Sequence, residues 1–287
     1  MSAKTESIGK KKKVWKAVNV VLNALLICTL SVASQLIYNY NRYRSFFVIG
    51  DSMYPFFNGE STRTNLETGA VETKDTHNGD WGNYDDTHYS YTCDYGLLDD
   101  RDDFLTRTNR FDVVVAYFDN DYSLETSSLK DTNSHGAKIK RLYAFPGESL
   151  YFDEEGRFFL KEVGKNDYEE IPQNESIVKD GHSKETTIDA KYATKEHPTT
   201  LKEGEYFVVG DNRRVGKSND SRQQGPIGRM HFENDRYPFG SFYLRGRIVA
   251  ITGKARIDVK YDEDGTKSIS STPILSSFYF PWGIKEL

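Results

Sequence analysis

Cysteines and histidines are few in this sequence. Two of its 287 residues are cysteines, and only Cys93 lies outside a long apolar segment that contains Cys28. The remainder of the chain therefore cannot form an intrachain disulfide, and we interpret Cys93 as a buried thiol. His182 and His197, two of the six histidines, have no metal-ligand spacing to another histidine, so we expect no metal site.

Beyond its first residues, the chain carries more negative than positive charge. The formal net charge is −5, although Lys10 to Lys13 outweigh Glu6 and make residues 1–13 basic. The rest of the chain is therefore more acidic than the whole. This balance argues against nucleic acid as a partner.

Charged residues are absent altogether from Ala17 to Tyr40. About 24 helical residues span roughly 36 Å, more than the ~30 Å hydrocarbon core of a bilayer, so this segment predicts one transmembrane helix. The lysines before it outnumber Arg42 and Arg44 after it, and the positive-inside rule then places the N-terminus in the cytoplasm and the remainder outside. The small residues of Ser31-Val32-Ala33 leave a cleaved signal peptide as the alternative.

The chain beyond this segment is rich in aromatic residues, with 19 Tyr and 17 Phe in all, a bias that favours strands over helices. We therefore predict a mostly β fold. Apolar or alternating runs bounded by turn residues predict strands at 46–49, 111–118, 138–144, 149–152, 157–161, 206–209, 247–252 and 255–261. A polar stretch, 58–109, is predicted to be a long insertion. Its acidic run Asp99-Asp100-Arg101-Asp102-Asp103 lacks the spacing of a calcium loop, so we expect a solvated loop there.

A candidate nucleophile lies shortly beyond the apolar segment, in Gly50-Asp51-Ser52-Met53-Tyr54-Pro55. A serine hydroxyl needs a base within hydrogen-bond reach, and no serine–histidine pairing stands out. The best base is a lysine of Ala137-Lys138-Ile139-Lys140-Arg141, because burial can lower a lysine pKa from ~10.4 to near ~7, at a cost of ~4 kcal/mol to the charged form. Lys138 and Lys140 share one face of a predicted strand, so the residues alone do not decide between them.

A third polar motif follows the predicted strand 206–209. It consists of Gly210-Asp211-Asn212-Arg213 and, four residues on, Ser218-Asn219-Asp220-Ser221-Arg222. Asp220 and Arg222 are close enough in the chain to pair, and a serine hydroxyl in such a loop can orient a neutral lysine amine.

These motifs, with Phe111-Asp112-Val113-Val114-Val115 and Phe145-Pro146-Gly147-Glu148 between them, resemble in type and order those of the bacterial type I signal peptidases. The resemblance implies a signal-peptidase-like β catalytic domain behind a single transmembrane helix. It also implies a Ser/Lys dyad, with Ser52 as nucleophile and Lys140, the lysine immediately before arginine, as general base. Ser218 would then orient Lys140. The supporting polar network would consist of Asp211, Asp220, Arg141 and Arg222.

The resemblance further implies an oxyanion hole that includes the Ser52 backbone N–H. Some relatives add a serine hydroxyl two residues before the nucleophile. Here that position is Gly50, so a second donor would be a backbone N–H. Another departure is Phe56-Phe57, where the family usually has threonine and an aliphatic residue.

The implied substrate is a translocated preprotein whose signal peptide ends in small residues and binds as an added strand. The residues expected to bind it are Phe47, Val48, Ile49, Met53, Ala137, Lys138 and Ile139. No cofactor is implied. A single-pass protein of the cell membrane would meet the lipid bilayer and work near the secretion translocon.

The predicted domains are a cytoplasmic basic N-terminus at 1–13, a transmembrane anchor at 14–40, and a catalytic β domain at 44–152 and 204–287. The insertion 58–109 lies within the catalytic domain, and a cap-like β region occupies 153–203. Two alternatives stay open. One is another Ser/Lys protease, such as a self-cleaving repressor or a maturation peptidase. The other is a catalytically silent relative that binds surface proteins as an assembly factor.

Overall fold

The fold divides into two compact units, Met1–Arg44 and Ser45–Leu287. The computed structural model describes residues 2–54, 56–57, 62–73, 88–101, 103–118, 137–173, 190–214, 216, 218–228, 244–261, 267–277 and 285–286.

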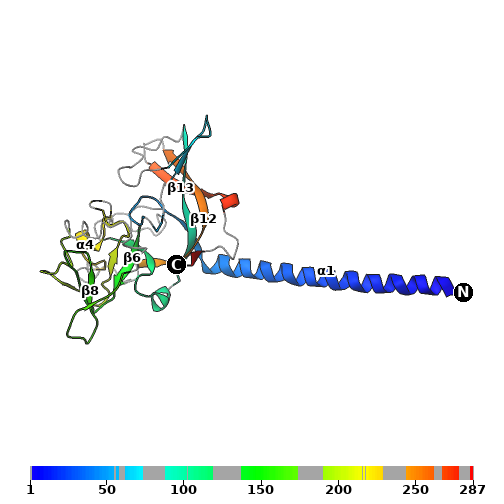
Figure 1. The fold of residues 1–287 in the computed structure, drawn as a ribbon, viewed down its shortest axis with the longest axis horizontal. Coiled ribbons are helices and arrows are strands. Elements are labelled where there is room, and N and C mark those ends of the chain that lie inside the picture. Colours follow the sequence, from blue (N-terminus) through cyan, green and yellow to red (C-terminus); the bar gives the residue numbers. More distant parts are fainter. Residues whose placement is uncertain are drawn as a thin grey trace. The chain divides into compact units, whose positions relative to one another are not determined.

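The first unit is the helix α1 (Ser2–Arg42) (Figure 1). Its window Val18–Gln35 is long and apolar enough to cross a membrane, and none of that window is buried inside the structure. Leucines at positions such as Leu25 and Leu30 are more than half exposed. A continuous exposed apolar surface of this kind suits lipid better than water, so it is compatible with a membrane span or a signal sequence.

The second unit is mostly β, which confirms the predicted fold class (Figure 1). Its main sheet has ten strands, seven of them in the order β11-β6-β5-β12-β4-β2-β3, with β1 paired to β4 and both β13 and β14 paired to β12. The bounds are β1 (Arg44–Phe47), β2 (Thr62–Asn65), β3 (Val71–Thr73), β4 (Tyr89–Asp99), β5 (Val113–Tyr117), β6 (Ala137–Ala144), β11 (Phe207–Val209), β12 (Leu244–Tyr261), β13 (Lys267–Pro273) and β14 (Lys285–Glu286). Short helices are η1 (Phe104–Arg107), α4 (Ser221–Gln224) and η5 (Leu275–Ser277).

The strand β12 connects much of this sheet, because it pairs antiparallel with β4, β5, β13 and β14. The sequence predicted two strands here, at 247–252 and 255–261, and the structure has one. Register shifts between Ile251 and Gly253 bend the strand without ending it. Close approach of the backbones requires glycine at Gly96 of β4, where a Cβ would lie 2.2 Å from the Ala250 carbonyl oxygen.

The insertion predicted at 58–109 contains β2, β3 and β4, so part of it belongs to the main sheet. β4 lies between β12 and β2 inside the sheet. Its alternate residues Tyr91 and Cys93 are buried against Ala255 and Ile257 of β12. Tyrosine and threonine make such a strand polar in composition although its alternation of faces is that of a half-buried strand.

The acidic run, which begins at the last residue of β4, differs from its prediction at Asp99. Asp99 is only 1 % exposed, and both Arg101 and Arg107 donate hydrogen bonds to its carboxylate. The hydrogen bond from Arg101 is the largest cause of the lowered pKa of Asp99, and the charge of Arg107 lowers it further. The solvated loop is therefore wrong for Asp99, because paired arginines allow the carboxylate to be buried.

A second, four-stranded sheet has the order β10-β7-β8-β9. Its strands are β7 (Ser149–Phe152), β8 (Phe158–Lys161), β9 (Glu169–Glu170) and β10 (Thr199–Thr200). Phe152 and Phe158 pack with Tyr143 of β6 and Phe207 of β11, so one core joins the small sheet to the main one. β7 pairs with β8, and the small sheet therefore begins at Ser149, before the expected cap boundary at residue 153.

Candidate active site

Ser52 lies in a turn that follows β1 (Arg44–Phe47). Gly50 has a φ of 81°, a left-handed conformation that favours glycine, although a Cβ there would meet no atom within 4 Å. Beyond Ser52, the N–H of Phe57 donates to the Met53 carbonyl at 2.9 Å, and both side chains are buried. The half-buried Ser52 thus lies between a glycine in the left-handed conformation and the buried residues Met53 and Phe57.

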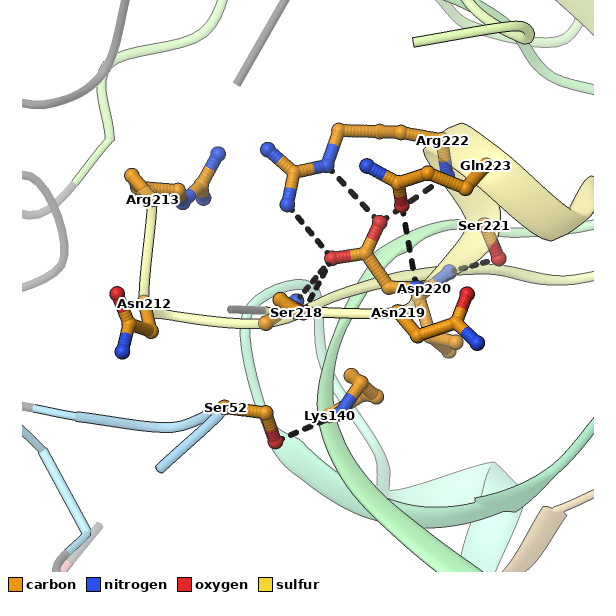
Figure 2. A network of polar contacts seen from close by, with 12 residues as sticks. Ser52, Lys140, Asn212, Arg213, Ser218, Asn219, Asp220, Ser221, Arg222 and Gln223 are labelled. Atoms are coloured by element: carbon orange, nitrogen blue, oxygen red, sulfur yellow. Dashed lines mark hydrogen bonds and ion pairs between the residues drawn. The ribbon is translucent and has the colours of Figure 1, made fainter. Parts of the chain in front are cut away.

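Lys140 of β6 meets Ser52 directly (Figure 2). Its Nζ donates to Ser52 Oγ at 2.8 Å and to the Ile139 carbonyl oxygen at 3.0 Å, and the residue is 2 % exposed. Both acceptors are neutral. Burial lowers the pKa of Lys140 to about 8, with Asp220 and Asp211 opposing the change and Lys138 reinforcing it. An amine with this pKa is partly neutral near physiological pH, as a general base requires.

Lys138, the other lysine of the sequence motif, has a different setting. Its ammonium lies over the ring of Phe118, 5.3 Å from the centroid, and the residue is only half-buried. The structure thus places Lys140, not Lys138, at hydrogen-bond distance from Ser52 Oγ.

Arg141, the next residue of β6, forms a buried ion pair with Asp211. Arg141 Nε lies 2.9 Å from Asp211 Oδ1, and Nη2 lies 2.5 Å from Oδ2. Arg141 Nη1 also donates to the Phe111 carbonyl at 2.6 Å. Although burial opposes the charge, Asp211 raises the pKa of Arg141. The pair ties β6 to the loop after β11 (Phe207–Val209) and keeps Arg141 charged.

Asp220 organises the rest of that loop (Figure 2). Its carboxylate accepts from Gly210 N–H at 2.9 Å, from Ser218 Oγ at 2.7 Å, and from Arg222 Nε and Nη2 at 2.9 and 2.7 Å. Asp220 is also the N-cap of α4 in a capping box with Gln223. Burial would raise the pKa of Asp220, but Arg222 and the hydrogen bonds lower it to about 2. The carboxylate is therefore charged, and it fixes the positions of Gly210 and Ser218.

Gly210 has no room for a side chain. A Cβ there would lie 2.0 Å from Ser218 Oγ and 2.6 Å from the Ser52 carbonyl oxygen. The loop after β11 therefore packs directly against the Ser52 turn. Ser218 donates to Asp220, whereas Lys140 bonds to Ser52 and Ile139 among the residues that the structure describes. The orientation of Lys140 by Ser218 stays a prediction.

Asn212 is a site residue that the sequence did not single out. Its backbone N–H donates to the Ser52 carbonyl at 2.9 Å, and its side-chain Nδ2 donates to the Asp51 carbonyl at 2.9 Å. The side chain is fully buried. No local pattern distinguishes it, because both partners lie 160 or more residues away in sequence.

Phe56 and Phe57, the departure from the family pattern, have structural contacts. Phe57 is buried in a core cluster with Phe46 and Met53, while Phe56 is half-buried and meets the Phe57 ring edge to face. The Arg141 guanidinium lies over the Phe56 ring, 4.7 Å from its centroid. An aromatic residue at this position thus adds a cation–π contact to the buried ion pair.

The residues expected to bind substrate divide by exposure. Val48 and Met53 are buried in the core cluster, on which Ala137 and Ile139 pack as partly buried residues, and Ile49 is 39 % exposed. Phe47 packs instead against the cluster around Tyr91. Any contact of Val48 or Met53 with a substrate would therefore involve their backbone.

The first half of β6 has an open edge in the part of the chain that the structure describes. β5 pairs with β6 from Ala137 to Arg141, whereas β11 pairs with β6 only from Arg141 to Ala144. Residues 137–140 therefore have a described neighbour on one side alone. This edge leads to Lys140, so an extended peptide lying on it would pass the Ser52–Lys140 pair.

The described residues include no group of three or more His, Cys, Asp or Glu side chains that could hold a metal ion. The chemistry that this arrangement can perform is nucleophilic attack by a serine whose proton passes to a buried lysine.

Residues 23–235 of the chain match the family described as signal peptidase, peptidase S26. The chain belongs to this family. The match spans Ser52, Lys140 and the loop up to Arg222, and it confirms the resemblance drawn from the sequence motifs. At the level of the family, this membership supports the function of a serine protease of the signal peptidase type. A comparison with curated proteins found no match.

Proposed function

We propose that this signal peptidase is a membrane-anchored endopeptidase that removes signal peptides from translocated preproteins, with Ser52 as nucleophile and Lys140 as general base. The observation that carries the proposal is the 2.8 Å hydrogen bond between Lys140 Nζ and Ser52 Oγ. The lowered pKa of Lys140, about 8, supports it, because a fully charged ammonium cannot accept the serine proton.

In the proposed reaction, Ser52 Oγ bonds to the scissile carbonyl carbon while its proton passes to Lys140 Nζ, and the carbonyl electron pair moves onto oxygen. The C–N bond then breaks, and Lys140 returns the proton to the leaving amine. The signal peptide remains as an ester on Ser52. Lys140 next takes a proton from water, whose oxygen attacks the ester, and the C–Oγ bond breaks as Ser52 regains a proton.

The developing oxyanion needs a donor beside Ser52 Oγ. Within the described part of the chain, the Ser52 N–H donates to no protein acceptor, so it is available for this role. Any second donor would be a backbone N–H, because Gly50 has no side chain to supply one.

We place the signal peptide's C-terminal segment along the open edge of β6 at Ala137–Ile139, opposite residues 47–50. Backbone hydrogen bonds would supply affinity in this mode. Shallow pockets beside the partly buried Ala137 and Ile139 would select small residues at the first and third positions before the cut.

The supporting residues would act through position. The Arg141–Asp211 and Arg222–Asp220 pairs hold the loop after β11 against the Ser52 turn, and Ser218, bonded to Asp220, would orient Lys140. The helix α1 would anchor the enzyme with its lysine-rich start in the cytoplasm, so that residues 45–287 meet preproteins outside, beside the bilayer and the translocon.

The test is cleavage of a preprotein whose signal ends in Ala-x-Ala by the detergent-solubilised chain. We expect Ser52→Ala and Lys140→Ala to lose activity by at least ~10³-fold. Ser270→Ala and Lys202→Ala, which alter an exposed serine and an exposed lysine, are the matched controls and should cleave at the wild-type rate.

Cleavage that survives either dyad substitution would refute the dyad. A wild-type rate that rises with pH only near ~10.4 would contradict a buried base. A wild type that binds a surface protein and cleaves nothing would favour the assembly factor.

A further inference from the structure

Asn212 holds the backbone on both sides of Ser52. Its N–H lies 2.9 Å from the Ser52 carbonyl oxygen, and its Nδ2 lies 2.9 Å from the Asp51 carbonyl oxygen. The Tyr54 N–H donates to the same Asp51 carbonyl at 3.0 Å. In Figure 2 the Asn212 side chain points to the side of its loop that faces the Ser52 segment, opposite to Arg213.

The chemistry of the contact fixes which end of the Asn212 amide faces Asp51. A carbonyl oxygen only accepts, so the NH₂ group must face it. The other end agrees with this orientation, because Oδ1 accepts from the Arg214 N–H at 3.4 Å. The contact therefore depends on an amide side chain.

Because the peptide unit is planar, this contact also determines the direction of the Ser52 N–H. The Asp51 carbonyl and the Ser52 N–H belong to one planar trans unit and point in opposite directions. A donor that holds the carbonyl therefore sets the direction of the N–H. In the same way, the bond from Asn212 N–H to the Ser52 carbonyl holds the next peptide plane. Both peptide planes that flank Ser52 are thus held by Asn212.

We infer that Asn212 is a positioning residue that presets the Ser52 N–H as the oxyanion donor. The inference rests on the proposed function, in which Ser52 forms the tetrahedral intermediate. Asn212 reaches Ser52 through backbone atoms, and its hydrogen bonds go neither to Ser52 Oγ nor to Lys140 Nζ. Its role is therefore separable from that of the dyad.

This separation gives a kinetic signature. Asn212→Ala removes the Nδ2 donor, and Asn212→Asp places an oxygen against the Asp51 oxygen at nearly constant volume. Both variants keep the backbone N–H. We expect kcat to fall about 10- to 100-fold, less than the ~10²- to 10³-fold cost of removing an oxyanion donor altogether. KM and the pH midpoint of the rate should stay unchanged, because the β6 edge and the Lys140 contacts are untouched.

The matched control is Asn219→Ala in the same loop. Asn219 Oδ1 accepts from Gln224 Nε2 at 2.6 Å in an exposed pair away from Ser52. This variant should keep the wild-type kcat, KM and pH midpoint.

A second measurement isolates the oxyanion. A peptide aldehyde ending in Ala-x-Ala adds Ser52 Oγ to its carbonyl carbon, the carbonyl electron pair moves onto oxygen, and the serine proton passes to Lys140. We expect both Asn212 variants to lose aldehyde affinity by the factor that they lose in kcat. Affinity for the corresponding uncleavable peptide amide, which forms no oxyanion, should be retained.

The outcomes separate the two proposals. A wild type that cleaves while Asn212→Ala matches Asn219→Ala overturns the inference about Asn212 alone. A higher KM, a weaker amide affinity and a lower thermal stability in both Asn212 variants would mark a merely structural role. That result would also overturn the inference about Asn212. A wild type that neither cleaves nor forms the aldehyde adduct overturns the proposed function, and the inference with it.

Discussion

Lys140 and Arg141 are adjacent cations of β6, and the protein gives them opposite surroundings. Lys140 bonds to two neutral oxygens and its pKa falls to about 8, whereas Arg141 meets the carboxylate of Asp211 and its pKa rises. Both residues are almost completely buried. The difference therefore comes from the partners and not from the depth of burial.

The strand β6 gives two neighbouring residues different contacts: Lys140 bonds to Ser52, whereas Arg141 pairs with Asp211 in the loop after β11. Successive side chains of a strand point to opposite faces, so residues 140 and 141 can have unrelated environments. On one face a cation without a bonded carboxylate can lose its proton. On the other face a charge-assisted pair holds the loop that packs against Ser52. Each of the two environments affects the free energy of unfolding, and each effect can be measured.

The largest effect is expected from Arg141→Met, which leaves the Asp211 carboxylate buried without its partner. A broken buried pair costs about 3–5 kcal/mol, so the free energy of unfolding should fall by that amount. The measurement is chemical denaturation at fixed detergent, followed by near-ultraviolet circular dichroism. The double variant Arg141→Met/Asp211→Ala removes both charges and should regain much of the loss. A single variant as stable as wild type would contradict the structural role of the pair.

Lys140→Met should have the opposite effect on stability while abolishing cleavage. The folded pKa of Lys140, about 8, lies below the ordinary value of 10.5, so burial of the charged form destabilises the fold below pH 8. That penalty corresponds to about 3 kcal/mol. As pH rises from about 8 to 10.5, the folded wild type loses its proton before the unfolded chain and gains stability.

The methionine variant lacks this titration. It should therefore exceed the wild type most at neutral pH, and its advantage should shrink above pH 8. Equal stability of the two proteins at all pH values would mean that burial of Lys140 carries no penalty. Such trade-offs between stability and activity are expected where a site holds a strained or desolvated group.

The same two residues show how far sequence reasoning reaches. The mostly β fold followed from aromatic-rich alternating runs, and the structure confirms it. Lys138 and Lys140 could not be separated by periodicity, because both occupy one face of a strand and only tertiary packing distinguishes them. Asn212 was missed for a related reason, since its partners are backbone carbonyls of a turn remote in sequence.

Composition alone does not show which residues of the polar stretch 58–109 are buried. Tyr91 and Cys93 of β4 lie in this stretch, and they alternate into the core. Asp99 was expected in solvent, yet Arg101 and Arg107 neutralise it inside the fold. In both cases burial depends on contacts that composition does not show: β12 covers Tyr91 and Cys93, and two arginines nearby in the chain pair with Asp99.

The smallest effect is expected from Lys138→Gln, which tests the charges around Lys140. The positive charge of Lys138 helps to lower the pKa of Lys140, so its removal should raise that pKa. Less of the Lys140 amine is then neutral at pH 7, and the pH profile of kcat should move to higher pH with a loss of a few-fold at most. Lys202→Gln, at an exposed lysine, should leave the profile in place. A profile that moves to lower pH in Lys138→Gln would show that a group other than Lys140 controls the rate, which would end the contrast with Arg141.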